Sequence, residues 1–319
     1  MNIIRYRKLF FGISGVLVLA SIVTLFIPPA LSPGIDFSGG AALTVKFEDQ
    51  IRARQVERVL DSIGYDEAVI QSTSDNSFFL RVRELEEPIR DDAGVITTPG
   101  EQAAIEDALA ALGTFEITEA VTVSGIIGAE NVRNAIIAVV VAAIAILFYV
   151  TWAFRHVPSP FRYGMAAIIA LVHDVLIVLG IFSILGKTID LEVNAMFITG
   201  VLTVIGYSVN DTIVVFDRVR ENVLRFPAST IGEVVNLSVR ETIGRSLNTS
   251  VTLLLVVLSL ALFASTAIQP LLFVMAAGVV VGTYSSIFIA SLTLVAWEAG
   301  EIGGLFSRIP LIGGRRRSA

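Results

Sequence analysis

The chain has 319 residues, of which 54% are hydrophobic and only 16% are charged, and its formal net charge is −6. Soluble domains are usually about half apolar and about a quarter charged, so this composition indicates an integral membrane protein. There is no cysteine, so no disulfide can form, and the two histidines exclude a histidine-rich metal site. We see no zinc-ligand spacing and expect no metal.

Six apolar stretches each come close to the roughly 20 residues that cross a bilayer. They are residues 9–27, 132–152, 161–185, 191–216, 246–267 and 271–297. The first is longer than the roughly 7–15 apolar residues of a signal peptide, so we expect it to remain as an anchor. The expected domains are the N-terminus with the first span (1–27), a long segment (28–131), five further spans with a loop at 217–245 (132–298), and a basic tail (299–319). The loop is expected to form either a helix along the membrane surface or a plain connector.

Charge predicts the orientation of the chain in the membrane. Lys and Arg gather before the first span, after the second and fourth spans, and in the tail. Because positive loops stay in the cytoplasm, we expect both termini there and segment 28–131 on the outside. That segment holds 19 acidic and 7 basic residues, which argues against nucleic acid or anionic lipid as its ligand.

The long segment has the pattern of a small α+β domain. Residues 42–47, 68–73, 77–82 and 115–123 are strand-like, with a turn at Ser74, Asp75 and Asn76. Residues 51–63 and 98–112 have helical spacing, and we expect Thr98 to cap the second of these helices with Pro99 at its first position. The order β-α-β-β-α-β predicts a ferredoxin-like fold, which by itself identifies no function.

The most informative stretch is GYSVNDTIVVFDRVREN, residues 206–222, which carries Asn210, Asp211 and Thr212 inside an apolar span. A carboxylate at a helix centre costs about 2.5–3.5 kcal/mol on insertion scales, so it must face the bundle interior, find a partner or carry a proton. Arg245 opens the fifth span at a similar expected depth. The two residues could form a proton-coupled switch or a permanent structural ion pair.

Two further motifs contain polar residues. His173 and Asp174 lie near the middle of the third span, where they could extend a proton relay or form structural hydrogen bonds. The Gly-rich turn at residues 34–40, with Asp36, Gly39 and Gly40, favours a structural role at the entry to the first strand. It lacks the lysine and helix start of a phosphate-binding loop.

Enzyme signatures are weak. Residues 186–188 resemble the end of a P-loop, but the glycine required upstream is Ile181. Asp174 and Asp211 on separate spans could suggest an intramembrane aspartyl protease, although neither follows the Gly-x-Gly of such enzymes. We therefore expect a protein that is not an enzyme.

Four motifs in order resemble the SecF family: GIDFSGG (34–40), VHDVLIVLGIFSILG (172–186), residues 206–222, and RSLNTS (245–250). SecF proteins are membrane subunits of a bacterial protein-export accessory complex, related to the proton-driven RND transporters. The resemblance spans nearly the whole chain. It implies an α-helical polytopic fold with six transmembrane helices, half of an RND-type bundle, and a ferredoxin-like domain between helices 1 and 2.

The resemblance also implies partners and roles. The partners would be SecD, the SecYEG channel, an unfolded translocating polypeptide and, in some cases, YajC and YidC, with no nucleic acid. The chain would lie in the bacterial inner membrane, driven by the proton gradient without ATP or another cofactor. Asp211 would carry the proton and Arg245 would be its charged partner, with Asn210, Thr212, Asn248, Thr249, His173 and Asp174 shaping the site. A scaffold that moves no protons, or half of a small-molecule exporter, remain as alternatives.

Overall fold

The computed structural model describes residues 3–72, 76–83, 85, 89–90, 96–98 and 100–301. The chain divides into two compact units. The helical unit consists of Met1–Leu31, Ala138–Lys187 and Met196–Ala319, and the sheet unit consists of Ser32–Ile137 with Thr188–Ala195. The short link between the third and fourth spans thus belongs to the sheet unit.

The sheet unit has the ferredoxin-like order that the sequence predicts. Its main elements are β1 (Gly40–Phe47), α3 (Ala53–Ser62), β2 (Val69–Ser72), β3 (Ser77–Val82), α4 (Glu101–Ala110) and β6 (Phe115–Val123). A short helix α2 (Ile35–Ser38) precedes β1, and β4 (Ile89–Arg90) pairs with β5 (Ile96–Thr98) in a separate small sheet. The four-stranded sheet runs in the order β2-β3-β1-β6 with antiparallel neighbours, which confirms the fold class.

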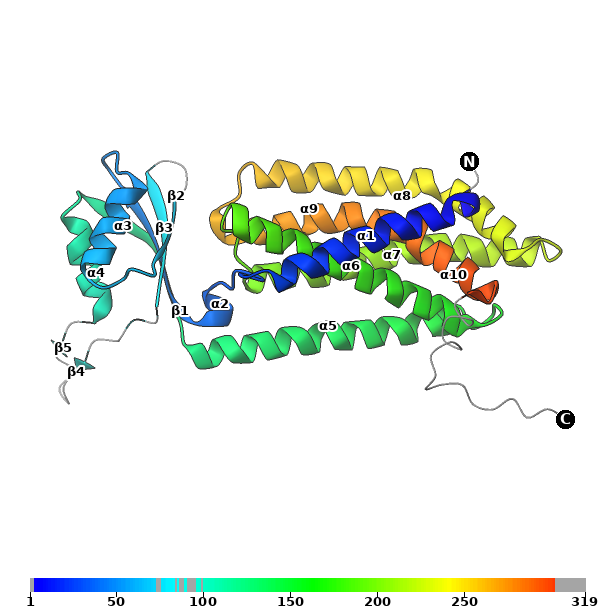
Figure 1. Cartoon of the computed structure of the whole chain (residues 1–319), viewed down its shortest axis with the longest axis horizontal. Helices are drawn as coiled ribbons and strands as arrows, with labels where there is room; N and C mark the ends of the chain where they lie inside the picture. Colours follow the sequence, from blue (N-terminus) through cyan, green and yellow to red (C-terminus); the bar gives the residue numbers. More distant parts are fainter. Residues whose placement is uncertain are drawn as a thin grey trace. The chain divides into compact units, whose positions relative to one another are not determined.

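One face of this sheet makes the core of the unit. Leu43 and Val45 of β1 lie opposite Leu80 and Phe78 of β3, and all four are buried. Helices α3 and α4 cover the same face (Figure 1) and contribute buried apolar residues to the cluster. Alternate residues of β1 and β3 therefore point into one core, as the period-2 pattern predicts.

Two details of the sheet unit differ from, or lie outside, the expectation. Helix α4 begins at Glu101 with Gly100 as its N-cap, so the prediction that Thr98 caps it is wrong. Thr98 instead ends the short strand β5, and Pro99 lies outside the described residues. Ser74 and Asp75 of the expected turn are also outside the described residues, whereas Asn76 has the positive φ of 56° that suits a tight turn.

The six predicted spans are confirmed as helices long and apolar enough to cross a membrane. They are α1 (Arg7–Phe26, preceded by the 3-10 turn Ile4–Tyr6), α5 (Gly125–Ala153), α6 (Pro160–Thr188), α7 (Ala195–Arg225), α8 (Ile231–Ala261) and a sixth helix in three parts. These parts are α9 (Gln269–Tyr284), the π-helical segment η3 (Ser285–Ala290) and α10 (Ser291–Glu298). A 3-10 turn, η2 (Thr266–Ile268), precedes α9.

Most of the expected loop at 217–245 is helical, because α7 continues to Arg225 and α8 already begins at Ile231. A capping box between Thr230 and Glu233 starts α8 by satisfying its first backbone amides. Asn222 of α7 then binds Ser238 of α8 at 3.0 Å. Basic residues that suggested a loop therefore lie on a helical hairpin, where charged side chains reach solvent without breaking the helix.

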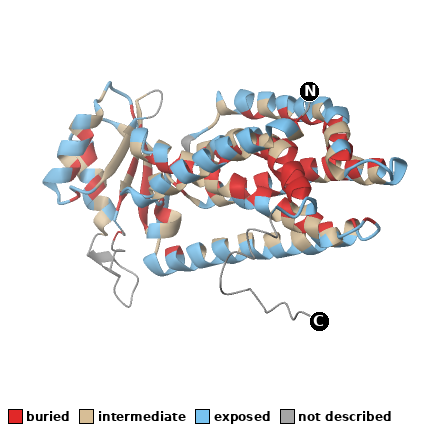
Figure 2. Cartoon of the chain, turned by 45° about the vertical axis from the view of Figure 1, so that its right-hand side comes forward, coloured by how far each residue is buried: buried red, intermediate tan, exposed pale blue. Residues whose placement is uncertain are grey.

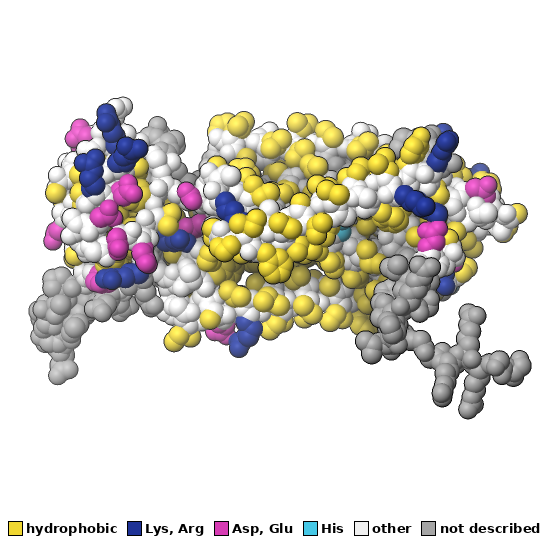
Figure 3. All heavy atoms as spheres, viewed as in Figure 1, with side chains coloured by type: hydrophobic (Ala, Val, Ile, Leu, Met, Phe, Trp, Pro, Cys, Tyr) yellow, Lys and Arg dark blue, Asp and Glu magenta, His cyan; other side chains and the backbone are white. Residues whose placement is uncertain are grey.

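Burial separates the helices into two groups. In the most apolar 18-residue stretch of each helix, about half of the residues are buried in α6, α7 and α9–α10. The buried share is only 11% in α1, 6% in α5 and 17% in α8. Figure 2 shows exposed residues along almost the whole of α5. In Figure 3, hydrophobic side chains cover the middle of the helices, and charged side chains lie over the sheet unit and at the ends of the helices. The exposed apolar helices have the composition of surfaces that meet lipid or other helices.

Candidate functional site

Asp211 is buried in the helical unit, with an exposed fraction of 6%. Its Oδ1 accepts a hydrogen bond of 2.6 Å from Ser246 Oγ of α8. Its Oδ2 is buried and has no hydrogen-bond partner among the described residues. Burial removes most of the hydration of an ionised carboxylate, so this second oxygen is a position where a proton can bind.

Arg245 does not form an ion pair with Asp211 in the described part of the chain. Its side chain is exposed, although its charge is near enough to act on Asp211. Neighbouring side chains on a helix point about 100° apart, so Ser246 faces inward where Arg245 faces outward. The sequence analysis named Arg245 and missed Ser246, which lies in the same RSLNTS motif.

The neighbours of Asp211 on α7 also face in different directions. Thr212 is 1% exposed, and its Oγ1 lies 2.8 Å from Ser286 Oγ of η3. Asn210 is exposed. The chain thus brings Thr212 to the buried site with Asp211 and leaves Asn210 outside it.

His173 and Asp174 of α6 form a second buried polar cluster. His173 Nδ1 lies 2.9 Å from Asp174 Oδ1, although the two residues are adjacent on the helix. Asp174 Oδ2 accepts hydrogen bonds from Ser208 Oγ of α7 at 2.6 Å and from Ser285 Oγ of η3 at 2.7 Å. Asp174 therefore ties three helices together, whereas His173 Nε2 is buried without a hydrogen-bond partner among the described residues.

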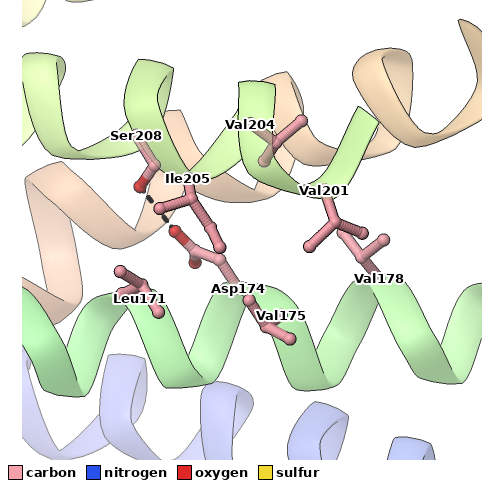
Figure 4. Close-up of a pocket in the computed structure, with 8 residues that line it drawn as sticks. All are labelled: Leu171, Asp174, Val175, Val178, Val201, Val204, Ile205 and Ser208. Atoms are coloured by element: carbon pink, nitrogen blue, oxygen red, sulfur yellow. Dashed lines mark hydrogen bonds between the residues drawn. The ribbon is translucent and has the colours of Figure 1, made fainter. Parts of the chain in front are cut away.

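A small cavity lies beside Asp174, between α6 and α7 (Figure 4). Its volume is about 10 Å³, room for one water at most. Only Asp174 and Ser208 contribute polar atoms; the other lining residues are Leu171, Val175, Val178, Val201, Val204 and Ile205. The cavity is too small and too apolar to hold an organic substrate.

The π-helical segment η3 connects the two clusters. A π turn carries more residues than an α turn, so successive side chains are turned by somewhat less than the 100° of an α-helix. Here Ser285 donates to Asp174, while Ser286 donates to the backbone carbonyl of Ser208 at 3.0 Å and meets Thr212. A continuous polar path thus runs from His173 and Asp174 to Thr212, next to Asp211. The run of small polar residues in the sixth span, which the sequence analysis did not single out, was the signal for this path.

A different set of polar residues lies on the exposed side of α7 and α8. Asn248 and Thr249 are exposed and line an open groove of about 500 Å³, with Tyr207, Thr252, Leu253 and Val256. Asn210 and Arg245 are exposed too. Polar groups at membrane depth need partners, since lipid tails provide none. This exposed polar face is therefore separate from the buried site that Asp211 and Thr212 share.

The Gly-rich turn lies in the sheet unit. Gly39 and Gly40 have φ values of 75° and 120°, which side-chain-bearing residues rarely adopt. Asp36 Oδ2 accepts a hydrogen bond of 2.8 Å from the backbone N–H of Ala195, the first residue of α7. Asp36 thus caps the helix on which Asp211 lies.

Comparison with known proteins identifies the family. The model described as "Protein export membrane protein SecD/SecF, C-terminal" matches residues 104–300. Protein translocase subunit SecF of Thermobaculum terrenum is 40% identical over 97% of both chains. The chain belongs to the SecD/SecF family of protein-export membrane proteins. The resemblance stated from the sequence motifs is confirmed.

Other SecD/SecF relatives agree. The SecF subunit of Anaerolinea thermophila is 36% identical over 97% of both chains. The crystal structure of SecDF, a translocon-associated membrane protein from Thermus thermophilus, matches with a TM-score of 0.79 and 32% identity over 94% of this chain. This chain spans only 39% of that SecDF chain. The match therefore covers less than half of that SecDF chain.

Proposed function

We propose that this SecD/SecF family member is a translocase subunit that uses the proton-motive force to promote late steps of protein export, in complex with SecD. The observation that carries this proposal is the state of Asp211. It is a buried carboxylate with one oxygen bound by Ser246 and the other without a partner among the described residues. A permanent ion pair with Arg245 would instead favour the charged form of Asp211 and oppose proton binding.

In the proposed cycle, a proton binds at Oδ2 of Asp211 and removes its charge. The attraction between Asp211 and Arg245 then weakens, and the hydrogen bond from Ser246 changes strength. Thr212 and Ser286 would pass the change to η3 and from there to Ser285 and Asp174. His173 would hold Asp174 in place, so the helices repack around a fixed point.

SecD is the proposed partner of the exposed polar face. Asn210, Arg245 and Asn248 are exposed, and lipid tails would offer their side chains no hydrogen-bond partner. The exposed Thr249 beside them already donates to the backbone carbonyl groups of Arg245 and Ser246. Related SecDF chains join a SecD part to a SecF part, which supports an assembly in which the partner's helices cover this face. Polar residues at a helix–helix contact bind their counterparts there.

The chain is a multi-pass membrane protein, and we place it in the bacterial inner membrane with both termini in the cytoplasm. The energy source would be the proton gradient, with no ATP or other cofactor. Further partners would be the SecYEG channel, YajC and YidC. The exported polypeptide would meet the sheet unit on the outer side.

The test is replacement of Asp211 with Asn in membranes that also contain SecD. Asn keeps the volume and one oxygen acceptor but cannot carry a proton. We expect assembly with SecD to persist and proton-motive-force-dependent completion of export to be lost. The matched control is Asp217→Asn on the same helix, because Asp217 is half exposed and pairs with Arg220. This control should export normally.

The outcomes separate the functions. If Asp211→Asn exports at the normal rate, the chain is a scaffold that moves no protons. If export is normal but a proton gradient drives transport of a small molecule, the chain is half of an exporter. The 10 Å³ cavity beside Asp174 is too small for such a substrate, so the open groove beside Asn248 would have to hold it. Loss of export with assembly intact supports the proton-driven subunit.

A further inference from the structure

The link between α6 and α7 is bonded closely to the start of the sheet unit. Val193 N–H donates to Ser32 O at 2.8 Å, and Gly34 N–H donates to Val193 O at 2.8 Å. Together these bonds make a parallel bridge between Pro33 and Val193. The link is thus held by backbone bonds to the residues that lead into the Gly-rich turn.

Side chains strengthen this attachment. Gln71 Nε2 of β2 donates to Asp190 O at 2.7 Å. Arg81 of β3 lies 3.1 Å from Glu192 and also donates to the carbonyl of Pro33. Glu192 is only 12% exposed. Burial raises its pKa, Arg81 opposes the shift, and the nearby charges of Asp36 and Asp190 add to it. The link is therefore tied to two strands of the sheet.

Asp36 connects this attachment to two membrane helices. Its Oδ2 accepts from Ala195 N–H at the first turn of α7, where an acidic group stabilises the helix dipole. Its backbone carbonyl accepts from Asn131 Nδ2 of α5 at 2.9 Å. A Cβ on Gly39 would lie 2.8 Å from the Cα of Gly125 at the start of α5, so the turn is also packed tightly against that helix.

We propose that the Gly-rich turn is a mechanical junction, and that Asp36 is the positioning residue through which a movement of α7 reaches the sheet unit. This inference rests on the proposed function, since α7 carries Asp211. The junction formed by Asp36, Ala195 and the link 188–195 lies within one compact unit, and α7 runs on from Ala195 as a single helix to Arg225. A helix capped in this way transmits rotation or displacement at its end to the group that caps it.

The test uses three variants in the full chain with its SecD partner. Asp36→Ala removes the acceptor, whereas Asp36→Asn keeps an oxygen that can accept the same hydrogen bond. Ala195→Pro removes the donor instead; proline is tolerated at the first position of a helix, and Ala195 is exposed, so α7 should still form. Proton-driven export should fall about ten-fold or more in Asp36→Ala and in Ala195→Pro, the scale of one hydrogen bond to a charged group.

Two results would support the junction. Asp36→Asn should restore most of the export, and the double variant Asp36→Ala/Ala195→Pro should be no worse than either single variant, because both remove one interaction. Normal export in Asp36→Ala, or effects that multiply in the double variant, would overturn the proposal.

Hydrogen exchange distinguishes failure of the junction from failure of the proposed function. Asp211→Asn should change exchange in residues 32–40 when Asp36 is present and leave it unchanged in the Asp36→Ala background. A change that persists without Asp36, or no change with it, would overturn the junction. Normal export in Asp211→Asn would refute the proton-driven function, while the exchange comparison would still decide the junction.

Discussion

Ser246 donates a 2.6 Å hydrogen bond to Asp211, and it is the side chain that meets this carboxylate in the described structure, in place of the neighbouring Arg245. A hydroxyl can stay bonded to a carboxyl group in either protonation state, because it both donates and accepts. An arginine favours only the charged form. Ser246 therefore suits a site that must gain and lose a proton without unfolding.

Replacing Ser246 with Ala should lower the free energy of unfolding by about 1.5–3 kcal/mol, the usual cost of losing a hydrogen bond to a charged group. Denaturant titration of the purified chain in mixed micelles measures this. The control is Ser259→Ala, also on α8, whose hydroxyl is exposed and bonds only to the carbonyl of Leu255. Equal losses in the two variants would contradict a special role for Ser246.

Ser285 and Ser291 offer a second matched pair. Both are fully buried, but Ser285 donates to the Asp174 carboxylate and Ser291 only to a backbone carbonyl. We expect Ser285→Ala to cost about 1.5–3 kcal/mol and Ser291→Ala about 0.5–1.5 kcal/mol of unfolding free energy. The same titration ranks them, and the reverse order would show that Asp174 does not depend on Ser285.

Gly278 of α9 packs directly against α7. A Cβ at this position would lie 2.4 Å from both γ-carbons of Val204, so Gly278→Ala must push the two helices apart. We expect a loss of about 1–3 kcal/mol, as for other overpacked cores. Gly206→Ala is the control, since its Cβ would meet nothing within 4 Å and alanine favours helix by about 1 kcal/mol. A loss in both variants would point to impaired membrane insertion rather than to packing.

Glu192 should make the stability of the sheet unit depend on pH. Burial raises its pKa, so the folded chain binds its proton more tightly than the unfolded chain does. Stability is then greatest below the ordinary value of about 4.5 and declines as the pH rises through the raised folded value. Thermal unfolding from pH 4 to pH 8 should show this decline in the native chain and a flatter profile in Glu192→Gln.

Arg81 provides the counter-test, because its charge opposes the shift at Glu192. Arg81→Ala should raise the pKa of Glu192 further and move the decline to higher pH. Glu116→Gln on β6, which changes an exposed carboxyl group, should leave the profile as it is. If the stability of the native chain does not change between pH 4 and pH 8, Glu192 does not make stability depend on pH.

Periodicity predicted most of the fold. Runs of apolar residues located all six spans, and alternation located the four strands of the main sheet. The helical part of the loop at 217–245 is continuous with α7 and α8, which the arginines could not show, because they indicate the side of the membrane and not the end of a helix. The prediction that Thr98 caps α4 failed because Thr98 belongs to the second small sheet, a strand pairing that no local sequence pattern indicates.

The site was only partly predictable for a geometric reason. Asp211, Thr212, His173 and Asp174 are conspicuous in apolar spans, and all four are buried. Which neighbour meets them depends on helix rotation, and a 100° step separates Arg245 from Ser246. The π turn at η3 changes that rotation within a single helix, so spacing rules for an α-helix could not have paired Ser285 with Asp174 and Ser286 with Thr212.

The same π turn keeps the far end of the sixth helix in phase with its near end. A π turn takes up one residue more than an α turn, so deleting one residue between 287 and 290 would restore an uninterrupted α-helix and leave the later side chains near their present orientation. Glu298 would still face Arg162 of α6, which it meets at 2.6 Å. The same deletion in the regular helix α9 would instead turn every later side chain by about 100°.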